Sequence, residues 1–167
     1  DLRGWSLMDD KDEPAKWTFP ARLLPPGEFL VVFASGKDRR APTGNRRFHT
    51  NFILEGLGEY LALFAPGSPA AVTAFAPRFP EQRRNVSYGV DDSNRWHYFP
   101  APTPGAPNGV SPIAGLAPPP QFRVERSVCE TPFALTLATP LEGATVRYTT
   151  DGSEPTATSG LVYTSPL

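Results

Sequence analysis

Cysteine and histidine are scarce in this chain of 167 residues, which has one cysteine, Cys129, and two histidines, His49 and His97. A single cysteine cannot form a disulfide within the chain. Zinc sites draw on several Cys or His ligands, so this sequence supplies that chemistry poorly. We therefore expect no metal centre and no cofactor, and we interpret Cys129 as a structural or surface thiol.

Long apolar runs and an excess of one charge are also missing. The longest purely apolar runs, residues 29–34 and 60–65, are far too short to cross a bilayer, so we expect no membrane insertion. Lysine and arginine number 16 and aspartate and glutamate 17, which gives a net charge of -1. A general nucleic-acid binder usually has a strong basic excess, so nucleic acid is disfavoured as a partner.

Proline and glycine are abundant, with 21 and 14 residues respectively. Proline breaks helix interiors, and no stretch shows apolar residues at helical spacing. Aromatic residues make up 11% of the chain and hydrophobic residues 40%, which is typical of a globular protein. The sequence therefore predicts an all-β protein of short strands and turns.

The first 99 residues show the patterns of strands. Alternation of apolar and polar residues at 5–7 and 17–19 indicates half-buried strands. The apolar run 29–34 predicts a central strand that is buried on both faces, and 52–54 with 60–64 predict a hairpin whose turn is 55–59. We expect further strands at 71–75, 86–89 and 96–99.

The domain organisation follows from a proline-rich stretch at 100–120. We expect a domain at 1–109, a stiff linker at 110–120 and a second module at 121–167. The first half of the stretch could equally be an ordered loop lying on the first domain. In the second module, 133–137, 144–149 and 162–163 predict about three strands, and the turn is at 150–153. So few strands suggest a module that is cut short.

Residues 1–109 resemble the lamin tail domain in its bacterial form. The resemblance implies an immunoglobulin-like β-sandwich, and the family usually begins with a strand that precedes the first matching piece and is missing here. We therefore expect a fragment. The resemblance is carried by the order and spacing of these pieces: Asp1 to Leu7, Trp17 to Pro20, Leu24 to Lys37, His49 to Leu54, Glu59 to Phe64, Ser87 to Gly89 and Thr103 to Asn108.

Residues 121–167 resemble the start of the immunoglobulin-like module at the carboxyl end of chitobiase and β-hexosaminidase enzymes. The matching pieces are Ala144 to Thr156 and Tyr163 to Leu167. Both resemblances imply accessory modules of large, secreted or surface-attached bacterial proteins, and neither brings a catalytic residue. They imply that the partners are other domains of the same polypeptide, together with a protein, glycan or cell-wall ligand.

The candidate binding residues are arginines, which could form a basic patch for phosphate or acidic polymers. The alternative is a solvated loop whose charge is balanced elsewhere. These arginines lie in one long polar loop and one later segment: Arg39, Arg40, Arg46, Arg47, Arg83 and Arg84, with Arg78 nearby.

Other groups favour structural interpretations. Asp9, Asp10, Asp12 and Glu13 could ligate calcium, but Lys11 interrupts them and a solvated loop fits better. His49 could be a general base, but no nucleophile is evident from the spacing. The aromatic residues Trp5, Trp17, Trp96 and Tyr98 could form a sugar-stacking platform, although their alternation favours the core.

These observations predict a non-catalytic extracellular module that binds, spaces or anchors a larger multidomain bacterial protein. The alternative is a nucleic-acid-binding accessory domain of a secreted, nuclease-type protein that uses the arginine-rich loop. A hydrolase would need a carboxylate pair or a metal that the sequence does not indicate.

Overall fold

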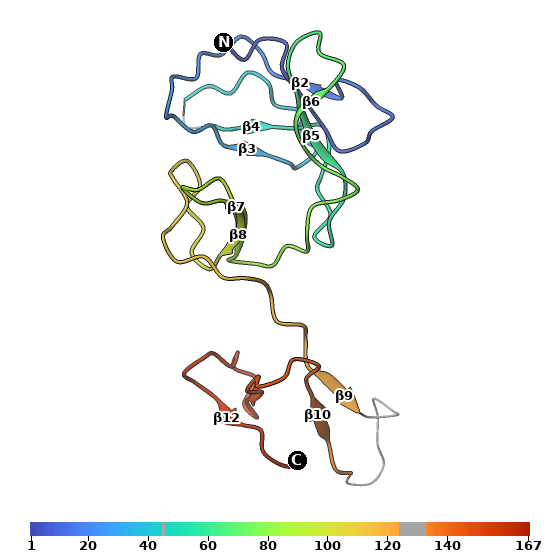
Figure 1. The fold of residues 1–167 in the computed structure, drawn as a ribbon, viewed down its shortest axis with the longest axis vertical. Coiled ribbons are helices and arrows are strands. Elements are labelled where there is room, and N and C mark those ends of the chain that lie inside the picture. Colours follow the sequence, from blue (N-terminus) through green and yellow to red (C-terminus); the bar gives the residue numbers. More distant parts are fainter. Residues whose placement is uncertain (45, 124–132) are drawn as a thin grey trace. The chain divides into compact units, whose positions relative to one another are not determined.

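The computed structural model describes residues 1–44, 46–123 and 133–167, and these residues form strands and turns without any helix. The all-β prediction is confirmed. No helix in the described ranges could span a membrane. The chain divides into two compact units, Asp1–Ala114 and Gly115–Leu167, so the boundary lies within the proline-rich stretch. Figure 1 shows the small sheets of each unit.

The largest sheet of the first unit has four strands in the order β2-β1-β5-β6, all antiparallel. The strands are β1 (Ser6–Met8), β2 (Trp17–Thr18), β5 (Leu61–Phe64) and β6 (Ala71–Phe75). Strands β1 and β5 are each hydrogen-bonded on both edges, so they are the two inner strands of the sheet. Ser6 and Met8 are buried on one face of β1, and Leu7 packs against the aromatic core on the other.

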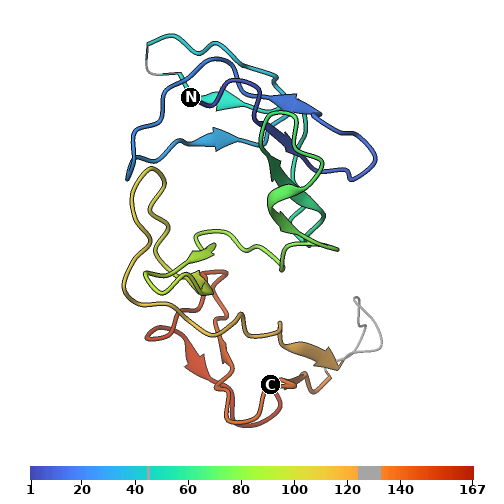
Figure 2. The same ribbon diagram turned by 45° about the horizontal axis from the view of Figure 1, so that its top comes forward.

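The core of the first unit is a cluster of four buried aromatic residues, Trp17, Phe19, Phe48 and Phe52. The Trp17 side chain is fully buried, and its ring meets Phe19 edge to face at a centroid distance of 4.8 Å. Edge-to-face aromatic pairs add to the free energy gained from burial alone. Because Trp17 lies on β2 and Phe48 on β4 (Phe48–His49), this cluster joins the four-stranded sheet to a neighbouring strand. Figure 2 shows the backbone of the first unit from a second direction.

A second, two-stranded sheet is formed by β3 (Val32–Phe33) and β4 (Phe48–His49), which run parallel. The prediction of a central strand at 29–34, buried on both faces, is wrong. Only two residues of the run pair, and Phe29 and Phe33 are 51% and 48% exposed. A short apolar run reveals hydrophobicity but not how many neighbours a strand will have, and here it has one.

The predicted hairpin between 52–54 and 60–64 is also wrong. Strand β5 pairs with β1 and β6, while Ile53 bridges Ser35. Residues 55–59 do turn, since Gly58 N–H donates to the Glu55 carbonyl at 3.0 Å. The turn then binds the segment after β6, because Phe79 N–H donates to the Glu59 carbonyl at 2.9 Å. The hairpin was predicted because residues 52–54 and 60–64 are close in the sequence, and closeness in the sequence does not decide which strands pair.

The predicted strands near 86–89 and 96–99 are confirmed as the hairpin β7 (Ser87–Val90) and β8 (Trp96–Phe99). The chain beyond β8 folds back onto this hairpin. Ile113 N–H donates to the Tyr98 carbonyl at 2.8 Å, and the Asn108 side-chain amide donates to the Val90 carbonyl at 2.9 Å. The first half of the proline-rich stretch is therefore an ordered loop on the first unit.

The second unit contains two pairs of short antiparallel strands. They are β9 (Gln121–Arg123) with β10 (Thr136–Ala138), and β11 (Arg147–Tyr148) with β12 (Leu161–Val162). The sequence indicated all but β9. The predicted turn at 150–153 is present, with the Asp151 carboxylate accepting the Ser153 N–H at 3.0 Å. Leu137 is buried in this unit, so its described core is small.

Candidate functional site

A cavity of about 410 Å³ in the first unit is lined by three arginines, Arg22, Arg46 and Arg47. The other lining residues come from the segment before β3, from the loop before β4, from β4 itself and from the loop after β8. These lining residues are Phe29, Leu30, Val31, Pro42, Gly44, Phe48, Pro104 and Gly105. The lining contains no acidic residue, so the cavity is positively charged.

Each wall of this arginine cavity is fixed by backbone contacts. The Arg22 N–H donates to the Asp1 carboxylate at 3.2 Å, and the Arg22 carbonyl accepts the Leu2 N–H at 2.8 Å. Arg46 and Arg47 directly precede Phe48, whose side chain is 7% exposed and anchors β4 in the core. The third wall is held by the Ala106 N–H, which donates to the Thr103 carbonyl at 3.1 Å.

The three guanidinium groups of the cavity have no carboxylate within ion-pair distance in the described part of the chain. Arginine stays protonated throughout the physiological range and presents five N–H donors. All three arginines are exposed, so water solvates their charges, and an anion that enters the concavity can take the place of part of that water. The arrangement can therefore bind an oxyanion, but it cannot take up or release a proton.

The other predicted arginines lie elsewhere. Arg40 pairs with Asp38 at 2.7 Å and lies over the Trp17 ring at 6.0 Å, whereas Arg83 pairs with Glu81 at 3.0 Å. The backbone of Arg39 bridges to β4. Arg84 is exposed, and neither it nor Arg83 lines the cavity. Of the six arginines in the predicted patch, the cavity contains Arg46 and Arg47.

His49 has a hydroxyl partner that the sequence did not reveal. Its Nδ1 lies 2.6 Å from Ser35 Oγ, and its ring stacks on Phe33 at a centroid distance of 5.2 Å. Burial lowers the pKa of His49, and the positive charges of Arg39 and Lys37 lower it further. Neither Ser35 nor His49 lines a cavity described here, and the neighbouring charges are cationic. The pair therefore suits a structural role.

The acidic loop after β1 binds a lysine of its own chain. Lys16 Nζ lies 2.9 Å from Asp9 Oδ1 and 3.0 Å from Glu13 Oε2, and the two carboxylates raise the pKa of Lys16. The Asp10 carboxylate accepts the Asp12 N–H at 2.9 Å. Among the described residues, no three His, Cys, Asp or Glu side chains are grouped so that they could hold a metal ion.

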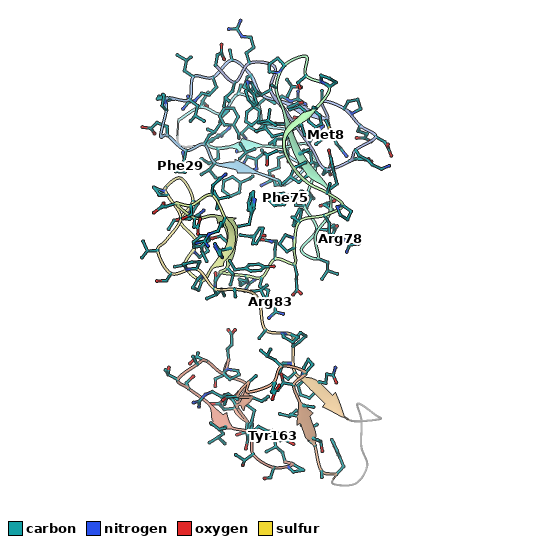
Figure 3. The ribbon with its side chains drawn as sticks, in the orientation of Figure 1. Met8, Phe29, Phe75, Arg78, Arg83 and Tyr163 are labelled. Atoms are coloured by element: carbon teal, nitrogen blue, oxygen red, sulfur yellow. The ribbon has the colours of Figure 1, made fainter. Side chains whose placement is uncertain are left out.

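The four predicted aromatic residues do not line one platform. Trp17 and Tyr98 are buried and Trp5 is partly buried. Trp96 is 46% exposed and stacks on Tyr88 at a centroid distance of 5.5 Å. Near this pair lies a second cavity of about 320 Å³, which has mostly apolar walls: Leu54, Glu55, Gly56, Leu61, Phe75, Phe79, Gln82 and Tyr88. Figure 3 shows where Phe75 lies.

Sequence reasoning missed two members of the arginine cavity and one other contact. Arg22 lies more than twenty positions before Arg46, so no local pattern connects them. The sequence predicts that Phe29 is buried, but its side chain is 51% exposed and it lines the cavity. Figure 3 labels Phe29. Ser35 was missed as the partner of His49 because a parallel strand pair brings the two together. Cys129 lies outside the described residues.

Comparison with known proteins gives one family match. Residues 128–167 match the model of the chitobiase/β-hexosaminidase C-terminal domain, which supports the resemblance seen in the second module. The match covers under a quarter of the chain. No curated protein and no solved structure matches the chain.

Proposed function

We propose that this chain is a non-catalytic binding module of a larger multidomain bacterial protein that acts outside the cell or at its surface. The observation that carries the proposal is the arginine cavity, whose charged members are Arg22, Arg46 and Arg47. Arginine binds anions but cannot serve as a proton donor or acceptor near neutral pH. A concavity with this composition is suited to holding a ligand and not to acid–base catalysis.

The domain organisation supports an accessory role. The first unit combines all-β architecture with the ordered sequence pieces that resemble the bacterial lamin tail domain. The second unit includes the match to the C-terminal domain of chitobiase and β-hexosaminidase enzymes, which is named for its position at the end of larger proteins. Pro118, Pro119 and Pro120 favour extended backbone at the start of the second unit, just before β9, which suits a module that spaces other domains.

A binding screen tests this proposal. The whole chain would be applied to arrays of glycans, bacterial cell-wall fragments and secreted proteins, alongside the double variant Arg46→Ala/Arg47→Ala. We expect binding to at least one class, and we expect the double variant to lose it. Absence of binding to every class would contradict the binding function and would leave spacing between domains as the role.

The alternative is a nucleic-acid-binding accessory domain of a secreted, nuclease-type protein. The observation in its favour is the same group of three cations, which could contact phosphates. Each neutralised phosphate adds about one to the slope of log affinity against log salt, so three contacts predict a slope of about -3 with duplex DNA. A salt-independent affinity, or none, would exclude this alternative.

A further inference from the structure

We propose that the arginine cavity binds a single terminal oxyanion, a phosphate monoester or a carboxylate, on a ligand whose apolar body rests against Phe29. This inference rests on the proposed binding function and names the class of ligand for that site. The cations are Arg22, Arg46 and Arg47, and the apolar wall is formed by Phe29 and Val31.

The charge of the cavity favours an anion as its ligand. Three arginines line one concavity of about 410 Å³, and no acidic residue is among its lining residues. Within the first unit, Arg40 pairs with Asp38 at 2.7 Å and Arg83 with Glu81 at 3.0 Å, whereas the cavity arginines form no ion pair with any described residue. The planar guanidinium fork matches the paired oxygens of a carboxylate or phosphate, and such charge-assisted hydrogen bonds are short and strong.

The apolar wall implies that the ligand is more than an inorganic ion. The Phe29 side chain is 51% exposed and borders the cavity, and Leu30 and Val31 line it beside Phe29. An aromatic ring next to cationic groups offers a surface for an apolar or planar body attached to the anion. Covering this ring would remove apolar area from water, which adds affinity that bare phosphate cannot obtain.

The size and surroundings of the cavity favour a terminal group over a polymer backbone. Its volume lies within the range of roughly 300–1,000 Å³ that is usual for small-molecule sites. Polyanions need a continuous track of cations, but Arg39, Arg40, Arg83 and Arg84 do not line this cavity. The net charge of -1 also gives no general attraction for a polyanion.

The backbone that carries the arginines is already fixed, which reduces the cost of ordering on binding. Arg22 is held through its own N–H and carbonyl, and Arg47 adjoins the buried Phe48. Gly105 has a φ of +84°, and a β-carbon there would lie 3.6 Å from Val31 Cγ2, so the loop after β8 packs closely on the apolar wall.

Calorimetric titration of the whole chain tests the assignment, with phenyl phosphate, benzoate, inorganic phosphate and benzyl alcohol as probes. We expect phenyl phosphate or benzoate to bind at least tenfold more tightly than inorganic phosphate, and benzyl alcohol not to bind. Which of the two aromatic anions binds more tightly identifies the oxyanion as phosphate or carboxylate. We expect Arg46→Ala/Arg47→Ala to weaken binding at least tenfold, and Phe29→Ala to remove the advantage over inorganic phosphate.

The matched control is Arg84→Ala, which removes an exposed arginine outside the cavity and should leave the affinity unchanged. Circular dichroism of each variant shows whether it folds. The assignment would be overturned if Arg84→Ala weakened binding of the aromatic anions as much as Arg46→Ala/Arg47→Ala does. It would also be overturned if a 20-nucleotide single strand of DNA bound more tightly than phenyl phosphate. If array binding persists in Arg46→Ala/Arg47→Ala, the binding function stands and this site assignment fails. If no probe and no array ligand binds, both fail.

Discussion

Ser35 Oγ and His49 Nδ1 are 2.6 Å apart and join the segment after β3 to strand β4. The two strands run parallel, with Phe33 opposite His49 in the register, and the Phe33 ring stacks on the imidazole. Arg39 and Lys37 contribute positive charge around the ring, and with burial they favour its neutral form. We therefore interpret the hydrogen bond as a connection between two short strands.

This relationship predicts how stability depends on pH. The pKa of His49 is lowered in the folded chain from its usual value of 6.5, first by burial and then by Arg39 and Lys37. The unfolded chain therefore takes up a proton more readily as the pH falls below 6.5. We expect the free energy of unfolding to decrease from there down to the lowered folded pKa, as measured by urea unfolding at several pH values. The variant His49→Gln should not show this decrease below pH 6.5. If its stability depended on pH as that of the wild type does, the prediction would be contradicted.

Trp17 is the residue on which the core of the first unit depends most. Its side chain is fully buried and contacts Phe19 and Phe48 edge to face. We expect Trp17→Ala to lower the free energy of unfolding by about 3–5 kcal/mol, because the change removes contacts and leaves a cavity. Trp96→Ala is the matched control, since Trp96 is 46% exposed, and it should cost well under half as much in chemical denaturation. Equal losses would contradict the burial of Trp17.

Gly58 allows the turn before β5 to approach the segment after β6. Its φ is +92°, and a β-carbon there would lie 1.9 Å from the Phe79 carbonyl oxygen, which is backbone and cannot move aside easily. We expect Gly58→Ala to cost more than about 2 kcal/mol in the free energy of unfolding.

The comparison variant for Gly58 is Gly27→Ala. Gly27 has a φ of +79°, but nothing lies within 4 Å of a β-carbon built there. Only the backbone cost should appear, about 1 kcal/mol. Thermal or urea unfolding of both variants separates the steric cost from the conformational cost, and similar losses would show that Phe79 can move away.

Asp91 fixes the turn between β7 and β8. Its Oδ1 accepts the N–H groups of Ser93 and Arg95, both at 2.9 Å, and its Oδ2 lies 3.2 Å from His97 Nε2. The backbone hydrogen bond from Arg95 is the main cause that lowers the pKa of Asp91 below its usual 3.8.

The lowered pKa of Asp91 predicts an acid-dependent loss of stability. The carboxylate contributes stability above pH 3.8, and this contribution is lost as the pH falls through the folded pKa. Fluorescence-detected unfolding between pH 5 and pH 2 should show the loss in the wild type and a smaller loss in Asp91→Asn. The variant Asp92→Asn, at the exposed neighbouring position, is the control and should behave like the wild type.

The sequence patterns that predicted strands and turns correctly were local ones. Alternation at β1 and β2, and the short runs that became β6, β7 and β8, require only period-two spacing, which any half-buried strand shows. The turn at Asp151 also follows from adjacent residues. The errors were about pairing. Residues 52–54 and 60–64 are close in sequence but do not pair, because β5 is held between β1 and β6.

The same distinction applies to the candidate site. Arg46 and Arg47 could be identified because they lie in a cluster of basic residues in the sequence. Arg22 and Phe29 come from other segments, so no such cluster points to them. The sequence shows which residues are charged, but it does not show whether a carboxylate lies close enough to neutralise a given arginine. Among the described residues, Arg40 and Arg83 have such partners and the three arginines of the cavity do not.

The sequence by itself determined the all-β class, because its proline and glycine content is incompatible with long helices and its apolar residues recur at strand spacing. It also determined the resemblance of the second module, which depends on adjacent residues. Only the tertiary structure decided that β1 and β5 are the inner strands of their sheet, that Phe29 is exposed and that Arg22 joins Arg46 and Arg47. These outcomes depend on contacts between segments far apart in the chain, and local periodicity contains no information about which segments will meet.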